Sequence, residues 1–501
     1  MSLTYVPYAE LERIRGLDGD PVERAAAFAD ACRINVLHMV QVAGSGHLGS
    51  SFSCIDMLAW LHLEVLGDDD RYYSSKGHDA PALYAVLIGM GVLPFDKLGG
   101  LRRLGGLPGH PDVLTIPQVH TNTGSLGMGI SKARGFVQAD RLAGRDGRVF
   151  VLTGDGELQE GQFWESLQPA VNARAGAITA IVDHNKVQSD TWVEAVSDLG
   201  DLEGKLRAFG WAVERCDGND IGAFADALAA LAEAPAGQPR ILVADTRKGA
   251  GVSFMEPHDL PEGDEGLYAF HSGAPSVEDH ERAIAEVRAR LDERLARLGA
   301  AGVQLDAVEP ASAPPAATGA RVQRIVPAYG RALLNRAERD TRVVALDADL
   351  RLDTGLVEFR SKLPDRFFEC GIAEQDMVSS AGAMALSGLV PVCHSFACFL
   401  STRPNEQIFN NATEGTKVIY VGSLAGLVPS GPGHSHQSVR DISALAAMPG
   451  MALAEPSTEH EAGLLIDWAI QEAAGPVYLR LGSVPWELPF DPATPDAVIP
   501  G

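Results

Sequence analysis

The residues best suited to chemistry lie in two short segments that each follow a run of apolar residues. The segments are Gly154-Asp155-Gly156 and, about thirty residues later, Asn185-Lys186-Val187. The runs before them, 148–153 and 177–182, are typical of buried parallel strands. Ligands of a doubly wound sheet bind at the carboxyl ends of its strands, so we expect both segments at one edge of a sheet.

Oxygen atoms in these segments predict a divalent metal ion that is bound to a diphosphate. The Asp155 carboxylate, the Asn185 amide oxygen and the Val187 carbonyl are hard ligands, which Mg²⁺ or Ca²⁺ prefers. The metal ion offsets the diphosphate charge, and Gly154 and Gly156 let the backbone approach the phosphates. A lone Gly-Asp-Gly is more often a turn than a site, so the prediction depends on the spacing to the asparagine.

The longer run over 154–161, Gly-Asp-Gly-Glu-Leu-Gln-Glu-Gly, together with Asn185-Lys186, resembles the thiamine diphosphate motif of the transketolase family. Further matches extend from about Gly46 to Arg480, nearly the whole chain. The resemblance implies an α/β fold with two thiamine diphosphate-binding domains, each built on a doubly wound parallel sheet. It also implies transfer of a two-carbon ketol unit from a ketose to an aldehyde, through a dihydroxyethyl intermediate on the cofactor.

Composition and charge restrict the class of protein. A chain of 501 residues with 46% hydrophobic residues is long enough for two or three domains with buried cores. It has no apolar run of ~18 residues and no signal sequence at its start, so we expect a cytoplasmic enzyme. A net charge of −25 argues against nucleic acid and anionic membranes as partners.

A segment rich in proline and alanine, from Val308 to Gly319, predicts the domain boundary. We expect a diphosphate- and metal-binding domain at 1–305, a linker at 306–322 and a pyrimidine-binding domain at 323–501. An amphipathic helix is predicted over 276–298. Strands of the second domain are predicted over 343–346, 390–393, 417–421 and 476–480. Transketolases normally continue into a third α/β domain, which we expect to be absent here or carried by a separate polypeptide.

Histidines beside glycine, serine or proline form the next group of candidates. They are His47, His78, His110 and His271. One histidine in such a loop is more often a capping or surface residue. The resemblance implies that all four surround the diphosphate and the C1 to C3 hydroxyls of the sugar, with His78 and His271 as cofactor ligands and His47, His110 and His271 as catalytic residues. Neutral imidazole both donates and accepts hydrogen bonds, which suits hydroxyl and carbonyl substrates.

Two further features of the first domain follow from the resemblance. Gly124 and Leu126, in the glycine-rich segment 123–129, match a loop that packs against the cofactor rings, although the segment alone also fits a helix start. Glu160 matches a residue at the dimer interface that couples two active centres; a solvated helix charge is the alternative. In this family each site combines two chains, so a homodimer is the expected active unit.

The segment 370–376 contains the family motif Gly-Ile-x-Glu, whose glutamate is Glu374. By resemblance, a protonated Glu374 hydrogen-bonds the cofactor's pyrimidine nitrogen and so lets the aminopyrimidine accept the C2 proton. This role requires a buried acid. Without the motif, a glutamate at a helix start is explained by the helix dipole alone.

Aromatic and polar residues of the second domain complete the expected site. Phe396 and Phe399 match the rings that pack against the pyrimidine, although core packing would explain them equally well. A family tyrosine three residues further on is replaced by Thr402. Asp349 matches a carboxylate beside the thiazolium, and His436 matches the histidine of the substrate channel.

The residues that clamp a sugar phosphate in transketolases are largely altered. The clamp arginine falls at Val326, with Arg324 as its substitute, the clamp serine at Asp353, and the clamp histidine near Gly422. Arg480 alone remains. A carboxylate within ~4 Å of a phosphate is unfavourable by on the order of a kcal/mol. We therefore expect a substrate that is unphosphorylated or carries a different group.

Two other functions stay open at this stage. The first is decarboxylation of a 2-oxo acid, as in deoxyxylulose-phosphate synthase, which uses the same cofactor motifs; His110 and His271 argue against it. The second is a non-catalytic subunit that only binds thiamine diphosphate. The presence of Asp155, Asn185 and Glu374 argues against that function.

Overall fold

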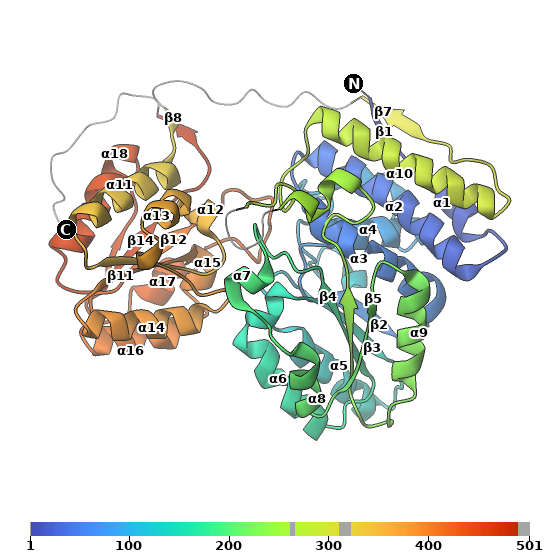
Figure 1. Cartoon of the computed structure of the whole chain (residues 1–501), viewed down its shortest axis with the longest axis horizontal. Helices are drawn as coiled ribbons and strands as arrows, with labels where there is room; N and C mark the ends of the chain where they lie inside the picture. Colours follow the sequence, from blue (N-terminus) through green and yellow to red (C-terminus); the bar gives the residue numbers. More distant parts are fainter. Residues whose placement is uncertain (1, 261–265, 310–321, 489–501) are drawn as a thin grey trace. The chain divides into compact units, whose positions relative to one another are not determined.

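The computed structural model describes residues 2–260, 266–309 and 322–488, which divide into two compact units (Figure 1). Unit 1 spans Met1–Ser312 and unit 2 spans Ala313–Gly501. Each unit contains one fully parallel sheet with helices on both faces, which confirms the predicted α/β class. No helix within the described ranges is long and apolar enough to cross a membrane.

The sheet of unit 1 has five strands in the order β2-β3-β4-β6-β5. They are β2 (Arg71–Ser74), β3 (Val149–Gly154), β4 (Ile178–His184), β5 (Ala212–Asp217) and β6 (Arg240–Asp245). Strands β3 and β4 are those predicted over 148–153 and 177–182. They are neighbours in register, with Gly154 beside Asp183. The segments that follow these strands therefore emerge at the same edge.

Alternate residues of β3 face two different helical layers. Phe150 and Leu152 share a core with α2, α3 and α4, whereas Val149 and Val151 share a core with α5 and α6. The helices of this unit are α1 (Tyr8–Arg15), α2 (Pro21–Ala43), α3 (Leu48–Trp60), α4 (Ala80–Gly89), α5 (Gly129–Ala143), α6 (Gly161–Asn172), α7 (Val193–Ser197), α8 (Leu202–Ala208), α9 (Ile221–Ala232) and α10 (Val277–Arg297). Burial on both faces explains why the strand runs are continuously apolar.

Helix α10 matches the amphipathic helix predicted over 276–298 and lies beside α2 (Figure 1). After it, β7 (Asp306–Val308) pairs antiparallel with β1 (Leu3–Tyr5). These three residues fall in the range expected as linker, yet they pair within unit 1. Residues 310–321 of that range lie outside the described residues.

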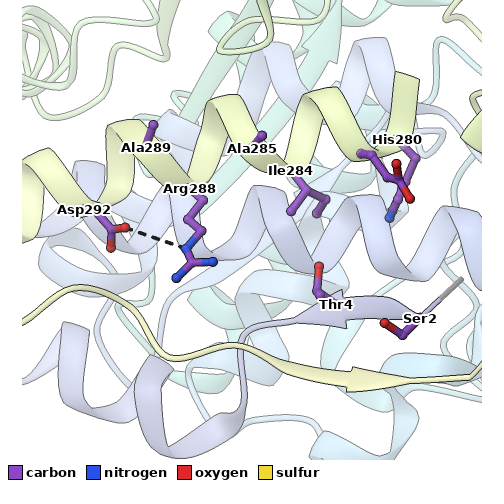
Figure 2. Close-up of a pocket in the computed structure, with 9 residues that line it drawn as sticks. Ser2, Thr4, His280, Ile284, Ala285, Arg288, Ala289 and Asp292 are labelled. Carbon is purple, nitrogen blue, oxygen red and sulfur yellow. Dashed lines mark ion pairs between the residues drawn. The ribbon is translucent and has the colours of Figure 1, made fainter. Parts of the chain in front are cut away.

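A groove of about 500 Å³ lies between α10 and β1. Figure 2 shows Ser2 and Thr4 on one side, facing His280, Ile284 and Arg288 of α10. The side chain of His280 is buried, and Arg288 lies 3.7 Å from a carboxylate oxygen of the same helix. The residues to which the sequence assigns chemistry are not among those that line this groove.

The sheet of unit 2 has six strands in the order β10-β9-β11-β12-β14-β13. They are β9 (Val343–Asp347), β10 (Phe367–Glu369), β11 (Val390–Phe396), β12 (Ile419–Ser423), β13 (Ala452–Ala454) and β14 (Val477–Arg480). The four strands predicted for this domain are confirmed as β9, β11, β12 and β14. A separate antiparallel pair joins β8 (Val322–Gln323) to β15 (Trp486–Glu487).

Helices cover both faces of this second sheet. One core contains α11, α13 and α18, and the other contains α14, α16 and α17. The helices are α11 (Ile325–Arg339), α12 (Arg351–Thr354), α13 (Val357–Lys362), α14 (Glu374–Leu386), α15 (Ala397–Leu400), α16 (Asn405–Thr413), α17 (Asp441–Leu445) and α18 (Glu459–Gln471). The expected functional residues follow the carboxyl ends of β9, β11 and β12 or begin α14.

Candidate active site

The Gly-Asp-Gly turn and the asparagine loop of unit 1 are in direct contact. Asp155 follows β3 and is buried, and its two carboxylate oxygens accept hydrogen bonds from the N–H groups of Gly156 (2.8 Å) and Lys186 (2.5 Å). Lys186 has a φ of 69°, the left-handed conformation that turns the loop back toward β3. The two segments singled out in the sequence thus form one structural unit.

The predicted metal ligands suit a hard divalent cation. Asp155, Asn185 and Val187 are all buried, and burial, reinforced by the nearby charge of Asp183, raises the pKa of Asp155. A buried carboxylate beside a second carboxylate is stabilised by a cation. The Asn185 side-chain oxygen accepts the N–H of Val187 at 3.1 Å, which fixes the amide within the loop. The donor set is therefore carboxylate, amide and carbonyl oxygen, as Mg²⁺ or Ca²⁺ requires.

Two buried lysines beside this loop were missed by the sequence analysis. Lys248 Nζ donates to the Val187 carbonyl (3.1 Å) and also contacts the Gln188 carbonyl and His271 Nδ1 (3.1 Å). Lys76 Nζ lies 2.5 Å from Asp183 Oδ2, and this carboxylate raises the lysine pKa although burial opposes it. Both lysines precede a glycine after the end of a strand, a signal that could have identified them as candidates for the site.

The four predicted histidines come together from separate loops of unit 1. The ring centroid of His47 lies 5.5 Å from that of His78, 5.9 Å from that of His110 and 5.3 Å from that of His271. Burial, together with nearby cationic groups, holds the pKa values of His47, His78 and His271 well below the usual range. These imidazoles are therefore neutral near pH 7 and can both donate and accept hydrogen bonds.

An orphan atom in the histidine cluster points to a ligand. His47 Nδ1 is buried and has no hydrogen-bond partner among the described residues, and the same holds for Thr123 Oγ1. Buried polar atoms in native proteins are normally hydrogen-bonded. The cluster thus carries unused hydrogen-bonding capacity beside the loops that would hold a diphosphate.

The glycine-rich loop of the prediction is fixed by a glutamate that the sequence analysis did not single out. Glu157 accepts hydrogen bonds from Gly127 N–H (2.8 Å), Gly154 N–H (3.2 Å) and Ser75 Oγ (2.5 Å). A Cβ atom on Gly77 would lie 2.5 Å from the nitrogen of Gly124, which has a φ of 105°, so these loops meet through their backbones.

Two further residues that the sequence analysis predicted for the site, Leu126 and Glu160, lie near this contact. Leu126 is half-buried in the glycine-rich loop. Glu160 precedes α6 and is only 8% exposed, so its alternative interpretation as a solvated helix charge is wrong. A Cβ atom on Gly127 would lie 3.0 Å from Glu160 Cβ, which places this glutamate directly against the loop.

In unit 2, Glu374 is the first residue of α14 and is buried, as expected. Its carboxylate does not stand alone, however. Arg403 Nη1 donates to both oxygens, at 2.7 and 2.9 Å, and Ser395 Oγ donates to Oε1 at 3.2 Å. The guanidinium thus contacts both oxygens of the carboxylate that the sequence analysis assigned to the pyrimidine. Arg403 was not anticipated, because the arginine lies 29 residues away in the chain.

Phe396, Phe399 and His436 form one aromatic cluster in unit 2. The two phenylalanine centroids are 5.9 Å apart, and the His436 ring lies 5.8 Å from Phe396 and 5.2 Å from Phe399. Thr402, at the position of the expected tyrosine, donates its hydroxyl to the Cys398 carbonyl (2.7 Å). The ring wall therefore exists without the tyrosine.

Asp349 lies in an acidic pocket at the end of β9. It is buried with a φ of 61°, and its N–H donates to Glu369 at 2.9 Å. Burial, together with Asp347, raises the pKa of Glu369. A residue held in this uncommon backbone conformation is fixed by its surroundings.

The surviving clamp residue, Arg480, is held by carboxylates of unit 2. Its Nε donates to Asp441 Oδ2 at 2.7 Å, and its Nη1 forms an ion pair with Glu455. Both acids neutralise the guanidinium, which is only 9% exposed as a residue. The one clamp cation that the sequence retains is thus already paired.

Among the other clamp positions, only the substitute Arg324 carries a cationic side chain. Val326 is buried in the core, and Arg324 is exposed before α11. A Cβ atom on Gly422 would lie 2.7 Å from the Tyr478 hydroxyl, so no side chain fits there. Asp353 lies exposed on α12 and adds negative charge.

Comparison with known protein families places the chain in the class of enzymes that bind thiamine diphosphate. The family model for the transketolase thiamine diphosphate-binding domain matches residues 24–267, and that for the transketolase pyrimidine-binding domain matches residues 324–483. The chain belongs to the transketolase family and is a thiamine diphosphate-dependent transferase.

Three relatives illustrate the range of this family. Transketolase-like protein 2 of Mus musculus is 30% identical over 473 residues, which cover 90% of this chain and 73% of the mouse protein. One of the subunits of the apulose-4-phosphate transketolase of Actinobacillus succinogenes is 37% identical over 264 residues, 50% of this chain and 94% of that protein. The 6-deoxy-6-sulfo-D-fructose transketolase subunit SqwG of a Clostridium species is 34% identical over 269 residues, 52% of this chain and 94% of that protein.

Proposed function

We propose that this enzyme transfers a two-carbon ketol unit from a ketose to an aldehyde, and that its sugar does not carry the usual terminal phosphate. The observation that carries the proposal is the pairing of Arg480 with Asp441 and Glu455. A guanidinium that already contacts two carboxylates has little attraction left for a phosphate. The exposed carboxylate of Asp353 acts in the same direction.

The cofactor half of the site is proposed to bind thiamine diphosphate through a metal ion. Asp155, Asn185 and the Val187 carbonyl would hold Mg²⁺ or Ca²⁺, while Lys248 would offset part of the remaining diphosphate charge. When bound, the cofactor supplies the carbanion chemistry of the reaction. The protein's own contribution is to orient the reactants and to hold protons.

Proton handling is assigned to the histidines and to Glu374. Neutral His47 and His271, together with His110, would hydrogen-bond the sugar hydroxyls and exchange protons with them. Glu374 would contact the pyrimidine nitrogen, and Phe396 with Phe399 would hold the ring. His436, in contact with both rings, would face the substrate.

We further propose a homodimer in which each site combines unit 1 of one chain with unit 2 of its partner. The family resemblance supports this assembly, and buried Glu160 is the proposed contact between the two centres. The relatives named as subunits support a second possibility, in which another polypeptide joins the complex. Light scattering of the purified chain with cofactor separates these states; a monomer that turns over substrate would contradict the shared site.

The experiment that tests the function compares kcat/KM for ribose 5-phosphate with kcat/KM for ribose and simple aldehydes, using one ketose donor. We expect no preference for the phosphate ester. A strong preference for it would refute the proposal for the substrate end. Release of CO₂ from pyruvate in the same preparation, without ketol transfer, would indicate the 2-oxo acid reaction instead.

A further inference from the structure

Glu157 connects three segments at the expected cofactor end of unit 1. Its Oε1 atom accepts hydrogen bonds from the N–H of Gly127 (2.8 Å) and from Ser75 Oγ (2.5 Å), and its Oε2 atom accepts the N–H of Gly154 (3.2 Å). The residue is only 2% exposed, so water competes little for these hydrogen bonds. One carboxyl group thus joins the segment after β2, the end of β3 and the glycine-rich loop over 123–129.

The end of β3 is held in place without this glutamate. Gly154 is the last residue of β3 and pairs with Asp183 of β4. The N–H of Asp155 donates to the Asp183 carbonyl (3.3 Å), and the Asp155 side chain accepts the N–H of Lys186. The turn proposed to hold the metal ion is therefore supported by the sheet and by hydrogen bonds of its own.

The glycine-rich loop lies outside the sheet and precedes α5. At its two ends, the N–H of Thr123 donates to a backbone carbonyl (3.2 Å), and the carbonyl of Gly129 accepts a tyrosine hydroxyl (2.7 Å). Between these ends, Gly127 has a φ of 87° and donates its N–H to Glu157. Loss of the carboxyl group should therefore loosen this loop more than it loosens the metal turn.

We propose that Glu157 is a positioning residue that shapes the subsite for the cofactor rings, separately from the subsite for the diphosphate. The inference rests on the proposed function and on the expected contact of Gly124 and Leu126 with the rings. Glu157 occupies the N–H of Gly127, which is thus not left for a phosphate, as N–H groups of other glycine-rich loops are. A loop that is ordered before the cofactor arrives loses less entropy on binding, which strengthens the affinity for the rings.

Two probes separate the subsites. Mg²⁺ with inorganic pyrophosphate tests the diphosphate subsite alone, whereas Mg²⁺ with thiamine diphosphate tests both, and calorimetry on the full chain gives the two affinities. In Glu157→Met, we expect the affinity for thiamine diphosphate to fall about ten-fold relative to that for pyrophosphate, because the N–H of Gly127 loses its acceptor. Any effect of charge at Glu157 acts on both probes and cancels in the ratio of the affinities.

Glu293→Met is the matched control, because Glu293 is an exposed glutamate of α10 and its loss should leave the ratio unchanged. Hydrogen–deuterium exchange of the cofactor-free enzyme is the second measurement. A peptide that covers 123–129 should exchange faster in Glu157→Met than in wild type, while a peptide from α9 should exchange equally in both.

An unchanged affinity ratio, or unchanged exchange over 123–129, would overturn the proposal. Faster exchange in α9 as well would indicate a general loss of stability and would count against it equally. If Glu157→Met does not fold, Glu157→Gln decides the question, since it preserves the side-chain volume and one acceptor oxygen. It should shift the ratio in the same direction by about two- to five-fold, and no shift refutes the proposal.

The inference and the proposed function can fail separately. A lowered affinity ratio in Glu157→Met, with no ketol transfer by wild type on any sugar, would support the inference and remove the proposed function. Ketol transfer by wild type with an unchanged ratio in the variant would do the reverse.

Discussion

The diphosphate region of unit 1 and the substrate end of unit 2 differ in how their charged groups are used. In unit 1, Lys248 contacts the carbonyls of Val187 and Gln188 and the ring of His271, and His47 has an orphan ring nitrogen; these groups suit an anion beside the Asp155 loop. In unit 2, the cation that should meet an anion, Arg480, is already neutralised. Within one family, cofactor binding and substrate recognition can therefore diverge separately.

The largest effect is expected when the proposed metal ligand of unit 1 is removed. Asp155→Ala should weaken Mg²⁺-dependent binding of thiamine diphosphate by roughly 100-fold or more, because the diphosphate charge is no longer compensated through the metal. Isothermal calorimetry measures the affinity. Asp146→Ala, an exposed aspartate of the same unit, serves as control and should bind normally. Unchanged affinity in Asp155→Ala would show that the cofactor binds elsewhere.

The second prediction concerns the acid of unit 2. Glu374→Gln should lower kcat by about 10²–10⁴-fold, the usual range for loss of an acid–base group, while cofactor affinity stays close to that of wild type. An amide cannot share a proton with the pyrimidine nitrogen. Steady-state kinetics and calorimetry on one preparation separate the two effects, and near-normal turnover would end the assignment of Glu374.

The third prediction tests whether Arg480 faces the substrate. Glu455→Gln removes one of its two acidic partners and should raise kcat/KM for ribose 5-phosphate by about two- to five-fold, the value of a partly exposed ion pair. Glu472→Gln, an exposed glutamate beyond α18, changes net charge equally and should have no such effect. Equal responses of the two variants would mean that Arg480 does not face the substrate.

The smallest predicted effect is on pH dependence in unit 1. Because burial lowers the pKa values of His47, His78 and His271, these histidines bind protons more strongly in the unfolded chain than in the folded protein. Stability from these neutral histidines is fully present above about pH 6.5 and is lost as pH falls below it, by about 1.4 kcal/mol per unit of pKa difference. The fall in Tm on acidification should be smaller in His47→Gln than in wild type. An identical fall would indicate other titrating groups.

The sequence predicted those features that depend on residues close in the chain or on a recurrent spacing. Continuous apolar runs identified β3 and β4 because both faces of these strands are covered by helices. The family resemblance implied that His47, His78 and His271 converge, and they do. The pairing of Arg403 with Glu374 and of Arg480 with Glu455 was not foreseen, because residues 29 and 25 apart meet only after the sheet has formed.

The short strand pair near the domain boundary also could not be predicted from the sequence. Residues 306–308 form a strand of only three residues, which is too short to show a recognisable pattern in the sequence. They form a strand because they pair with β1, at the other end of unit 1 in the sequence. Composition identified a proline- and alanine-rich segment, but composition does not specify where a strand forms with a distant partner. Ion pairs and short strands are thus the features that require the three-dimensional structure.

The crowding at Gly422 restricts the order in which this site could be redesigned. A Cβ atom there would meet the Tyr478 hydroxyl at 2.7 Å and Ala397 at 2.8 Å, both from neighbouring elements of the core. A histidine introduced at this position to recreate a phosphate clamp would destabilise the protein before it could bind anything. Because one of these contacts is with the backbone Cα of Ala397, a substitution at Tyr478 or Ala397 alone would not make room, and the start of α15 would also have to shift.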